Sequence, residues 1–424
     1  PASTLTLLVW HTPPNHLRGS AMSVEIRPIH HDELEAYGRV VAYVFASEDG
    51  LEDELKATQP DWTTCGFVDG KLVSTLGTLP FTVRLNGMAC PMGGVTAVGT
   101  LPEQRRRGLL RQVMTQALGT MRDRGQNLAI LWASMGAIYQ RFGYGLATAQ
   151  VNYSYDPRYV QFERDVDVPG SVELVSKDDS FPIIKQNYIE WATPRNLCIH
   201  RSTFLWTVNT LRPPKKDALV YTAIYRDADG QSRGHVVYST EDHTTPEPGP
   251  SQHMTVSDFV AMDTNAARAL WNYLRKHDLV GRIHFRGAPE DDVIPDLLLE
   301  PRMLNKKVSD GIWMRVVDAE KALAQRPYGA RGELTFAIAS DPECPWNEGT
   351  YLLETDGPTA HVSRTSREPE LTIPPATLAS LISGYRPASH FLRAGRLEEH
   401  SAGAALRADA LFRTEYAPYC PNGF

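Results

Sequence analysis

The spacing of apolar side chains predicts that the first third of the chain forms a mixed α/β unit. Short extended runs indicate strands, and apolar residues at three- and four-residue steps indicate helices. Asp69-Gly70 and Asn86-Gly87 are strong hairpin turns between the middle strands. In chain order the predicted elements are residues 24–28 (strand), 31–45 (helix), 63–68, 71–85 and 92–98 (strands), 102–124 (helix) and 128–133 (strand).

The meander-then-helix order returns in a second unit, after a segment over 155–170 that contains Pro and Gly and is predicted to be a linker. Its predicted elements are residues 181–191 and 202–209 (helices), 219–225, 235–240 and 253–262 (strands) and 266–277 (helix). A third unit begins near Met303, with strands over 313–317, 334–339 and 350–355 and helices over 319–325, 375–382 and 409–412. The fold class is therefore α/β with mixed sheets. We expect an extension over residues 1–21 and domains over 22–155, 156–300 and 301–424.

Composition narrows the class of protein without adding chemistry. The 424 residues suffice for two to four domains at about 100–200 residues each. No apolar run approaches the roughly 20 residues that span a bilayer, and the net charge of −7 does not favour nucleic acid. The five cysteines are scattered without a CxxC pair, which is typical of reduced thiols and gives no metal site. We expect a cytoplasmic protein, with secretion left open.

A strand that runs into a basic, glycine-containing segment is the candidate for chemistry. It reads Val98-Gly-Thr-Leu-Pro-Glu-Gln-Arg105-Arg-Arg-Gly108-Leu-Leu-Arg111. The first turn of a helix has unpaired N–H groups and the positive end of the dipole, which together hold a phosphate. Basic residues at that end are unfavourable by about 0.3–1 kcal/mol each. Arginines at 105, 106 and 107 at the start of the helix predicted over 102–124 therefore indicate an anionic ligand.

The segment Arg105-Arg-Arg-Gly108-Leu-Leu110 resembles the Arg/Gln-x-x-Gly-x-Gly/Ala signature of the GNAT acetyltransferases, with Leu110 in place of the usual small residue. The order of further motifs along the chain is similar to that of the Eis group of GNAT enzymes. These motifs are Ala133-Ser134, Ile138-Tyr-Gln-Arg-Phe-Gly-Tyr-Gly145, Asp310-Gly-Ile-Trp-Met-Arg315 and a terminal phenylalanine. The resemblance covers most of the chain from Met22 onward.

This resemblance implies tandem GNAT folds followed by a sterol-carrier-like domain, assembled as a homohexamer. The implied activity is direct transfer of acetyl from acetyl-CoA, the co-substrate, to a primary amine in a ternary complex. Aminoglycoside-like, polyamine-like and lysine acceptors are all implied. In the second unit, the strand-to-helix junction over residues 261–267 has neither glycine nor an arginine cluster, so we expect no CoA site there.

The resemblance also assigns roles to single residues. The cofactor-binding residues are Val98, Gly99, Thr100, Arg105, Arg106, Arg107, Gly108, Leu109, Leu110, Arg111 and Ser134. Tyr139 matches the general acid, because a phenol is protonated at neutral pH and can donate to the departing thiolate. Phe424 matches the other catalytic residue through its terminal carboxylate, an anion at neutral pH that can take a proton from an ammonium. Taken alone, Tyr139 reads as a core aromatic, and most chain termini fray.

Substrate preference and the alternative function depend on weaker patterns. Gly423 stands where the Eis group often has an acidic residue, which weakens the prediction of a polycationic acceptor. An acidic run, Glu48, Asp49, Glu52, Asp53 and Glu54, is either a lip for a cationic substrate or a solvated face. The alternative hypothesis is a carrier or sensor of an apolar ligand with a regulatory CoA site.

Overall fold

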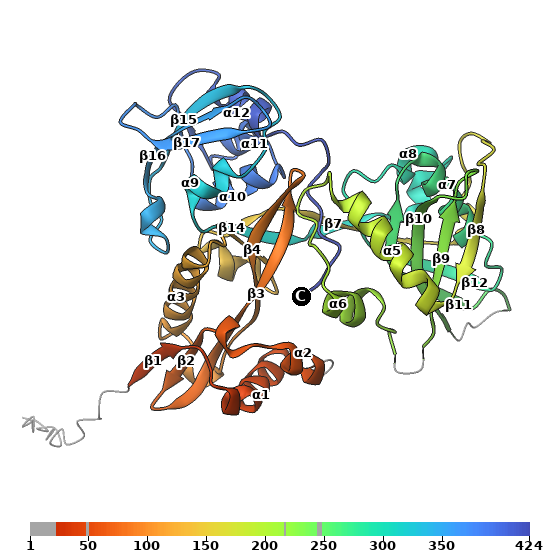
Figure 1. Cartoon of the computed structure of the whole chain (residues 1–424), viewed down its shortest axis with the longest axis horizontal. Helices are drawn as coiled ribbons and strands as arrows, with labels where there is room; N and C mark the ends of the chain where they lie inside the picture. The colour runs from red at the N-terminus through yellow and green to blue at the C-terminus, as the bar shows by residue number, and fades with distance from the viewer. Residues whose placement is uncertain (1–22, 48–50, 216–217, 244–247) are drawn as a thin grey trace, which may run out of the picture.

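A computed structural model describes residues 23–47, 51–215, 218–243 and 248–424. The predicted extension over 1–21 and the acidic residues Glu48 and Asp49 lie outside the described residues. Three mixed sheets are present, and each contains one parallel strand pair. The predicted α/β class is confirmed. Figure 1 shows the first unit at the lower left, the second at the right and the third above the first.

The first sheet has seven strands in the order β1-β2-β3-β4-β5-β14-β6. Their bounds are β1 Val24–Arg27, β2 Cys65–Val68, β3 Lys71–Leu85, β4 Met88–Thr100, β5 Leu128–Trp132, β14 Ile312–Val316 and β6 Gly145–Leu146. The helices of this unit are α1 Leu34–Phe45, α2 Leu51–Ala57, α3 Leu109–Asp123 and α4 Gly136–Gln140. Leu72 of β3 packs in the α1 cluster, and Val73 packs against Leu109 of α3. Successive strand residues face opposite sides, so α1 and α3 cover opposite faces.

The second sheet also has seven strands, in the order β13-β7-β12-β11-β10-β9-β8. Their bounds are β13 Lys307–Asp310, β7 Ala149–Tyr155, β12 Val280–Ala288, β11 Gln252–Ala261, β10 Ser232–Asp242, β9 Val220–Arg226 and β8 Ser171–Val175. The helices beside it are α5 Lys177–Ala192, α6 Thr203–Leu205, α7 Thr264–Leu274 and α8 Ile294–Leu297. Where a helix was predicted over 202–209, α6 is only one turn and continues as a π-helical segment, Trp206–Thr210.

The first two units exchange strands, so neither sheet is a continuous stretch of chain. β7 belongs to the second sheet, where it pairs with β12 and β13, although it precedes the predicted boundary at 155. β14 lies after residue 301, yet it pairs with β5 and β6 of the first sheet. An apolar strand pattern identifies which residues are buried but not which strand they pair with. Sequence spacing therefore could not show that β7 and β14 each join a sheet on the other side of a predicted domain boundary.

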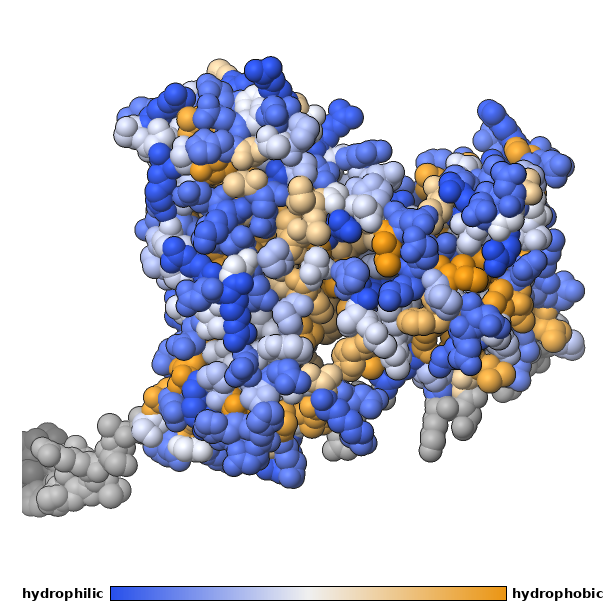
Figure 2. Space-filling model, viewed as in Figure 1, coloured by the Kyte–Doolittle hydropathy of each residue, from blue (hydrophilic) through white to orange (hydrophobic). Residues whose placement is uncertain are grey.

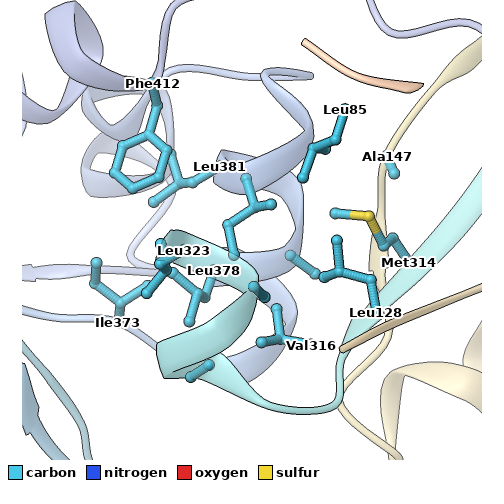
Figure 3. Packing of buried hydrophobic residues seen from close by; sticks show 14 of the residues in the cluster. Leu85, Leu128, Ala147, Met314, Val316, Leu323, Ile373, Leu378, Leu381 and Phe412 are labelled. Atoms are coloured by element: carbon cyan, nitrogen blue, oxygen red, sulfur yellow. The ribbon is translucent and has the colours of Figure 1, made fainter. Parts of the chain in front are cut away.

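The third unit packs on the first through a shared core (Figure 3). Its sheet has the order β17-β16-β15-β18-β19, with bounds Ala360–Arg364, Gly349–Thr355, Gly332–Ile338, Leu371–Thr372 and Glu398–Glu399. Its helices are α9 Ala319–Ala324, α10 Pro375–Ser383, α11 Ala388–Arg393 and α12 Ala404–Phe412. Leu128 and Met314 of the first sheet are buried in one cluster with Leu378 and Leu381 of α10. The two units therefore form one body around this core.

The last residues, 413–424, contain no helix or strand, but they are well packed. They run from α12 into the space between the first and second units, and the terminus lies near α6 and β3 (Figure 1). Figure 2 shows a hollow between these two units, with apolar surface along it. Among the described helices, none is both long and apolar enough to cross a bilayer.

Candidate active site

The first sheet opens where β4 and β5 part. The paired residues of these two parallel strands are Met92 with Leu128, Gly93 with Ala129 and Gly94 with Ile130. Beyond Gly94, β4 continues to Thr100 paired with β3 alone. The V-shaped gap leaves backbone N–H and C=O groups of β4 without a strand partner on the β5 side, and such groups require a hydrogen-bonding partner. An extended ligand with amide groups fits this need.

A bulge shapes the open part of β4. The strand carries one extra residue relative to β3 near Thr75, which places Ala97 and Val98 together opposite a single residue. Ala97 has a left-handed φ of 51°, and the Thr75 hydroxyl donates to its carbonyl at 2.8 Å. Gly99 is buried beneath α1, where an added Cβ would lie 3.0 Å from Val44. The structure thus places Val98, Gly99 and Thr100 along the gap.

The helix after β4 begins later than predicted. Residues 102–104 form a separate 3-10 turn, and α3 begins at Leu109. Arg106 and Gly108 have φ values of 64° and 78°, and these left-handed values cannot continue a right-handed helix. The prediction of one helix over 102–124 was therefore wrong at its start. The arginines at 105, 106 and 107 lie in a loop that leads into the helix.

Leu109, Leu110 and Arg111 supply the backbone N–H groups of the first turn of α3. Gln112 N–H donates to the Gly108 carbonyl at 3.3 Å, so the N–H groups that precede it have no acceptor within the helix. An added Cβ on Gly108 would meet nothing within 4 Å, so a ligand can approach this backbone closely. The helix start fits a phosphate or pyrophosphate.

The arginine loop adds positive charge at this helix start. All three side chains, Arg105, Arg106 and Arg107, are exposed. Arg105 Nε donates to the Thr100 carbonyl at 2.9 Å, which ties the loop to the end of β4. Arg107 Nη1 donates to Gln104 at 3.1 Å. The loop therefore joins the open strand to the helix start as one cationic surface.

Arg111 is engaged elsewhere. Its Nη1 lies 2.9 Å from Oε1 of Glu343 in the third unit, and Glu343 also accepts a hydrogen bond from Thr115. The Glu343 side chain is only 3% exposed, whereas that of Arg111 is 57% exposed. The guanidinium of Arg111 thus links α3 to the third unit, while its backbone N–H stays at the helix start.

Tyr139 lies on α4, directly after β5, and is buried to 6% exposure. Burial raises the pKa of its phenol above the ordinary value, so the hydroxyl keeps its proton. Its ring contacts that of Tyr144 edge to face, with 5.8 Å between centroids. Tyr144 is fully buried, and its hydroxyl lies 3.9 Å from Met114 Sδ in the core. Of the two tyrosines, Tyr139 keeps a small exposed surface, whereas Tyr144 has none.

The C-terminal residues are fixed beside the open end of β5. Trp132, the last residue of β5, donates its indole N–H to the Asn422 carbonyl at 2.8 Å. Asn209 of the second unit donates to the Gly423 carbonyl at 3.1 Å. The Phe424 ring packs edge to face on Phe81 of β3, with centroids 4.9 Å apart. These contacts hold the last three residues beside the end of β5, between the first two units.

Other predicted positions are less closely placed. Ser134 follows β5 and is exposed. Of the acidic run, Glu52, Asp53 and Glu54 are exposed on α2, and Glu52 pairs with Lys56 at 2.7 Å. Within the described part of the chain, no group of three or more His, Cys, Asp or Glu side chains is arranged to hold a metal ion.

Sequence reasoning missed the residues that hold the C-terminal tail, Phe81, Trp132 and Asn209. Each reads as an ordinary strand or helix residue, and no spacing rule relates them to residues 422–424. One signal was present: Trp132 ends an apolar strand, and a tryptophan at such a place needs an acceptor for its indole N–H.

The corresponding helix start in the second unit is already satisfied. Asp263 caps α7, and its carboxylate accepts a hydrogen bond from Ala266 N–H at 2.9 Å. Arg233 pairs with the same carboxylate at 3.2 Å. A negative side chain at this helix start competes with a phosphate, which supports the expectation of a single CoA site.

Comparison with known proteins agrees with this geometry. An acetyltransferase (GNAT) domain family matches residues 25–147, a second acetyltransferase (GNAT) domain family matches 197–316, and a sterol carrier protein domain family matches 319–421. These matches and the split strand pair define a GNAT acetyltransferase with a duplicated fold and a sterol-carrier domain. The predicted architecture is thereby confirmed.

An uncharacterized N-acetyltransferase of Streptomyces coelicolor is 30% identical over 421 residues, covering 95% of this chain and all of that one. The N-acetyltransferase Eis of Mycobacterium tuberculosis is 28% identical over 77% of this chain and 79% of its own. The crystal structure of Eis1 from Mycobacterium abscessus superposes with a TM-score of 0.83 at 28% identity, covering 95% of this chain and all of that one. The chain belongs to the GNAT N-acetyltransferases, and it is similar to the Eis proteins over most of its length. It is therefore an enzyme that transfers an acyl group.

Proposed function

We propose that the protein transfers acetyl from acetyl-CoA directly to a primary amine, with aminoglycoside-like, polyamine-like or lysine acceptors. The observation that carries the proposal is the C-terminal tail beside the split between β4 and β5, where the Asn422 carbonyl accepts the indole N–H of Trp132. Acetyl-CoA is a second substrate, and the residues present fit it. The open edge of β4 suits the pantetheine amides, and the start of α3 with its arginine loop suits the pyrophosphate.

In this proposal the chain supplies two groups to the reaction. The Phe424 carboxylate takes a proton from the acceptor ammonium, directly or through one water, so that the neutral amine forms the new C–N bond. Tyr139 gives its proton to the sulfur as the C–S bond breaks. Its raised pKa keeps the phenol protonated until that step. The attacking nitrogen gives its second proton to the Tyr139 phenolate, so the products are an N-acetylated amine and a free thiol, with one proton left on the carboxylate.

We propose a homo-oligomer for the assembly, a hexamer as in the resemblance to the Eis group. Light scattering coupled to size exclusion measures this directly, and a monomeric mass would contradict it. We also propose a cytoplasmic location, because all five cysteines are free, buried thiols and thiols stay reduced in the cytoplasm.

The test is thiol release from acetyl-CoA with a panel of amines, on the intact chain and on a chain lacking Phe424. We expect turnover with at least one amine and its collapse after truncation. Turnover that survives truncation would remove the carboxylate from the mechanism. Measurable CoA binding without turnover for any amine would favour the carrier or sensor alternative.

A further inference from the structure

The second sheet has a split like that of the first. Parallel strands β11 and β12 are paired only as far as Val256 and Phe285, although β11 continues to Ala261. The ladder between β11 and β10 shifts register directly after Val256 and resumes at Asp258. Asp258 therefore lies on β11 just after the bulge, where β11 has already parted from β12.

A cluster of side chains from this chain lies at the second split. Arg201 donates from Nη1 and Nη2 to the two carboxylate oxygens of Asp258, each at 2.8 Å. His235 Nε2 lies 3.0 Å from Asp258 Oδ2. The guanidinium also stacks over the rings of Tyr188 and Trp206, at 3.7 and 4.5 Å from their centroids. A bidentate, stacked and enclosed arginine is held in one orientation.

Burial and charge keep the Arg201–Asp258 pair ionised. Arg201 and Asp258 are 4% and 6% exposed. Burial alone would raise the pKa of the Asp258 carboxyl, but the Arg201 charge and the hydrogen bonds from Arg201 and His235 hold that pKa well below its usual range. Asp258 is therefore a carboxylate throughout the neutral and alkaline range, and its pair with Arg201 persists there.

One N–H of the guanidinium is directed away from Asp258 and toward the C-terminal tail. Arg201 Nε donates to the side-chain oxygen of Asn422 at 3.2 Å. The backbone carbonyl of the same asparagine accepts the indole N–H of Trp132 at 2.8 Å. Asn422 is fully buried. Through these two hydrogen bonds it links the second split to the open end of the first, two residues before the terminal residue.

We infer that Arg201, fixed by Asp258 and His235, is a positioning residue that sets the place of the Phe424 carboxylate through Asn422. The inference rests on the proposed function, in which that carboxylate accepts the ammonium proton. It gives the second GNAT unit a part in the reaction: its own split holds the tail that completes the active site of the first unit.

Variants of Asn422 test this without replacing Arg201 or Asp258. N422L keeps a similar volume but removes the acceptor for Arg201 Nε–H, whereas N422D keeps an acceptor oxygen. We expect kcat to fall about 10-fold or more in N422L, since small displacements of catalytic groups are costly, with the KM for acetyl-CoA unchanged. N422D should retain most of the wild-type kcat. Equal kcat values for N422L and wild type would contradict the inference.

The pH profile separates positioning from a general loss of stability. A displaced carboxylate cannot take the ammonium proton, so only amine that is already neutral reacts. The rate deficit of N422L should therefore shrink as pH rises toward the pKa of the acceptor amine. In a chain lacking Phe424, N422L should lower kcat no further, because the effects of two changes that act through the same group are not additive. Full additivity would overturn the inference.

N127L is the matched control. Asn127 is another buried asparagine at a joint between units, and its amide donates to Gln325 at 3.1 Å. Its replacement should lower the melting temperature without altering the pH profile. If the kcat of N127L also approached that of wild type as the pH rises, the pH dependence would reflect lost stability and not a displaced carboxylate.

Carboxypeptidase digestion followed by intact mass gives a readout independent of activity. Phe424 should be released faster from N422L and R201K than from wild type or N127L. Equal release from all four, in a protein whose turnover needs Phe424, would overturn the inference and leave the proposed function. Faster release from N422L and R201K in a protein without acetyl transfer would overturn the proposed function and keep Arg201 as the anchor of the tail.

Discussion

Phe81 lies directly over Gly94, and the two residues fit only because Gly94 has no side chain. An added Cβ at residue 94 would lie 2.2 Å from the Phe81 ring. Gly94 is also the last residue of β4 that pairs with β5. The Phe81 ring, on which Phe424 packs, therefore lies at the point where the two strands separate. The backbone of β4 at Gly94 thus sets the position of the terminal residue through Phe81.

Gly94→Ala should displace Phe81 and with it the terminal residue. We expect kcat to fall about 10- to 100-fold, as for other small displacements near the reacting groups, with CoA affinity retained. Gly119→Ala is the matched control, because an added Cβ there meets nothing within 4 Å on α3. That control should keep its activity and gain about 0.5–1 kcal/mol of stability from the better helix former. Unchanged kcat in Gly94→Ala would disprove the seating of the terminus.

Two changes at the terminus separate the carboxylate from the ring. Adding one glycine after Phe424 keeps the ring and moves the carboxylate by up to about 3.5 Å, so turnover should collapse. Phe424→Leu keeps the carboxylate and loses the edge-to-face contact with Phe81, worth about 0.5–1.5 kcal/mol beyond area burial. Its kcat should fall less. Steady-state kinetics decides, and the opposite ranking would make the ring the essential group.

Tyr139→Phe should lower kcat by about 10²- to 10⁴-fold, the usual contribution of a general acid, while CoA binding persists. Tyr144→Phe should change little, because the Tyr144 hydroxyl has a weak acceptor, Met114 Sδ, in the core. A general acid must be protonated, and burial raises the pKa of Tyr139. Any alkaline decline in kcat due to Tyr139 should thus lie above pH 10. A decline starting near pH 8 would point to another acid.

Arg106→Met and Arg111→Met should behave differently. Loss of Arg106, in the exposed loop, should raise the KM for acetyl-CoA without changing the melting temperature. Loss of Arg111 strips the buried Glu343 carboxylate of its ion pair and should cost about 1–2 kcal/mol of stability. Thermal unfolding and CoA titration measure both quantities. If both variants raised the KM for acetyl-CoA equally and both kept the stability of the wild type, Arg111 would bind the pyrophosphate and would not link the units.

The sequence predicted local features well where local rules decide them. The hairpin strand over 71–85 matches β3 in both bounds, because Asp69-Gly70 and Asn86-Gly87 fix its ends. Resemblance indicated that Tyr139 and the C-terminus act in one site, and the structure anchors the terminus beside β5. Their catalytic roles stay predictions.

What local rules could not predict depends on distant partners. Arg106 has left-handed backbone geometry that only the loop as a whole explains, so the start of α3 was misplaced. The strands β7 and β14 join sheets on the other side of a predicted boundary, since their pairing depends on contacts more than 120 residues apart, as between Tyr155 and Ile283 or Leu131 and Trp313. Arg201 gave no sequence signal, because its partners Asp258 and Asn422 are remote along the chain.

The exchange of β7 and β14 has a consequence during translation. The first sheet lacks an internal strand, β14, until the ribosome has made residue 316. A product that ends before residue 312 therefore cannot complete the first sheet. In the proposed mechanism the base is the α-carboxylate of Phe424, so a purification tag fused after Phe424 should abolish turnover while leaving the fold intact.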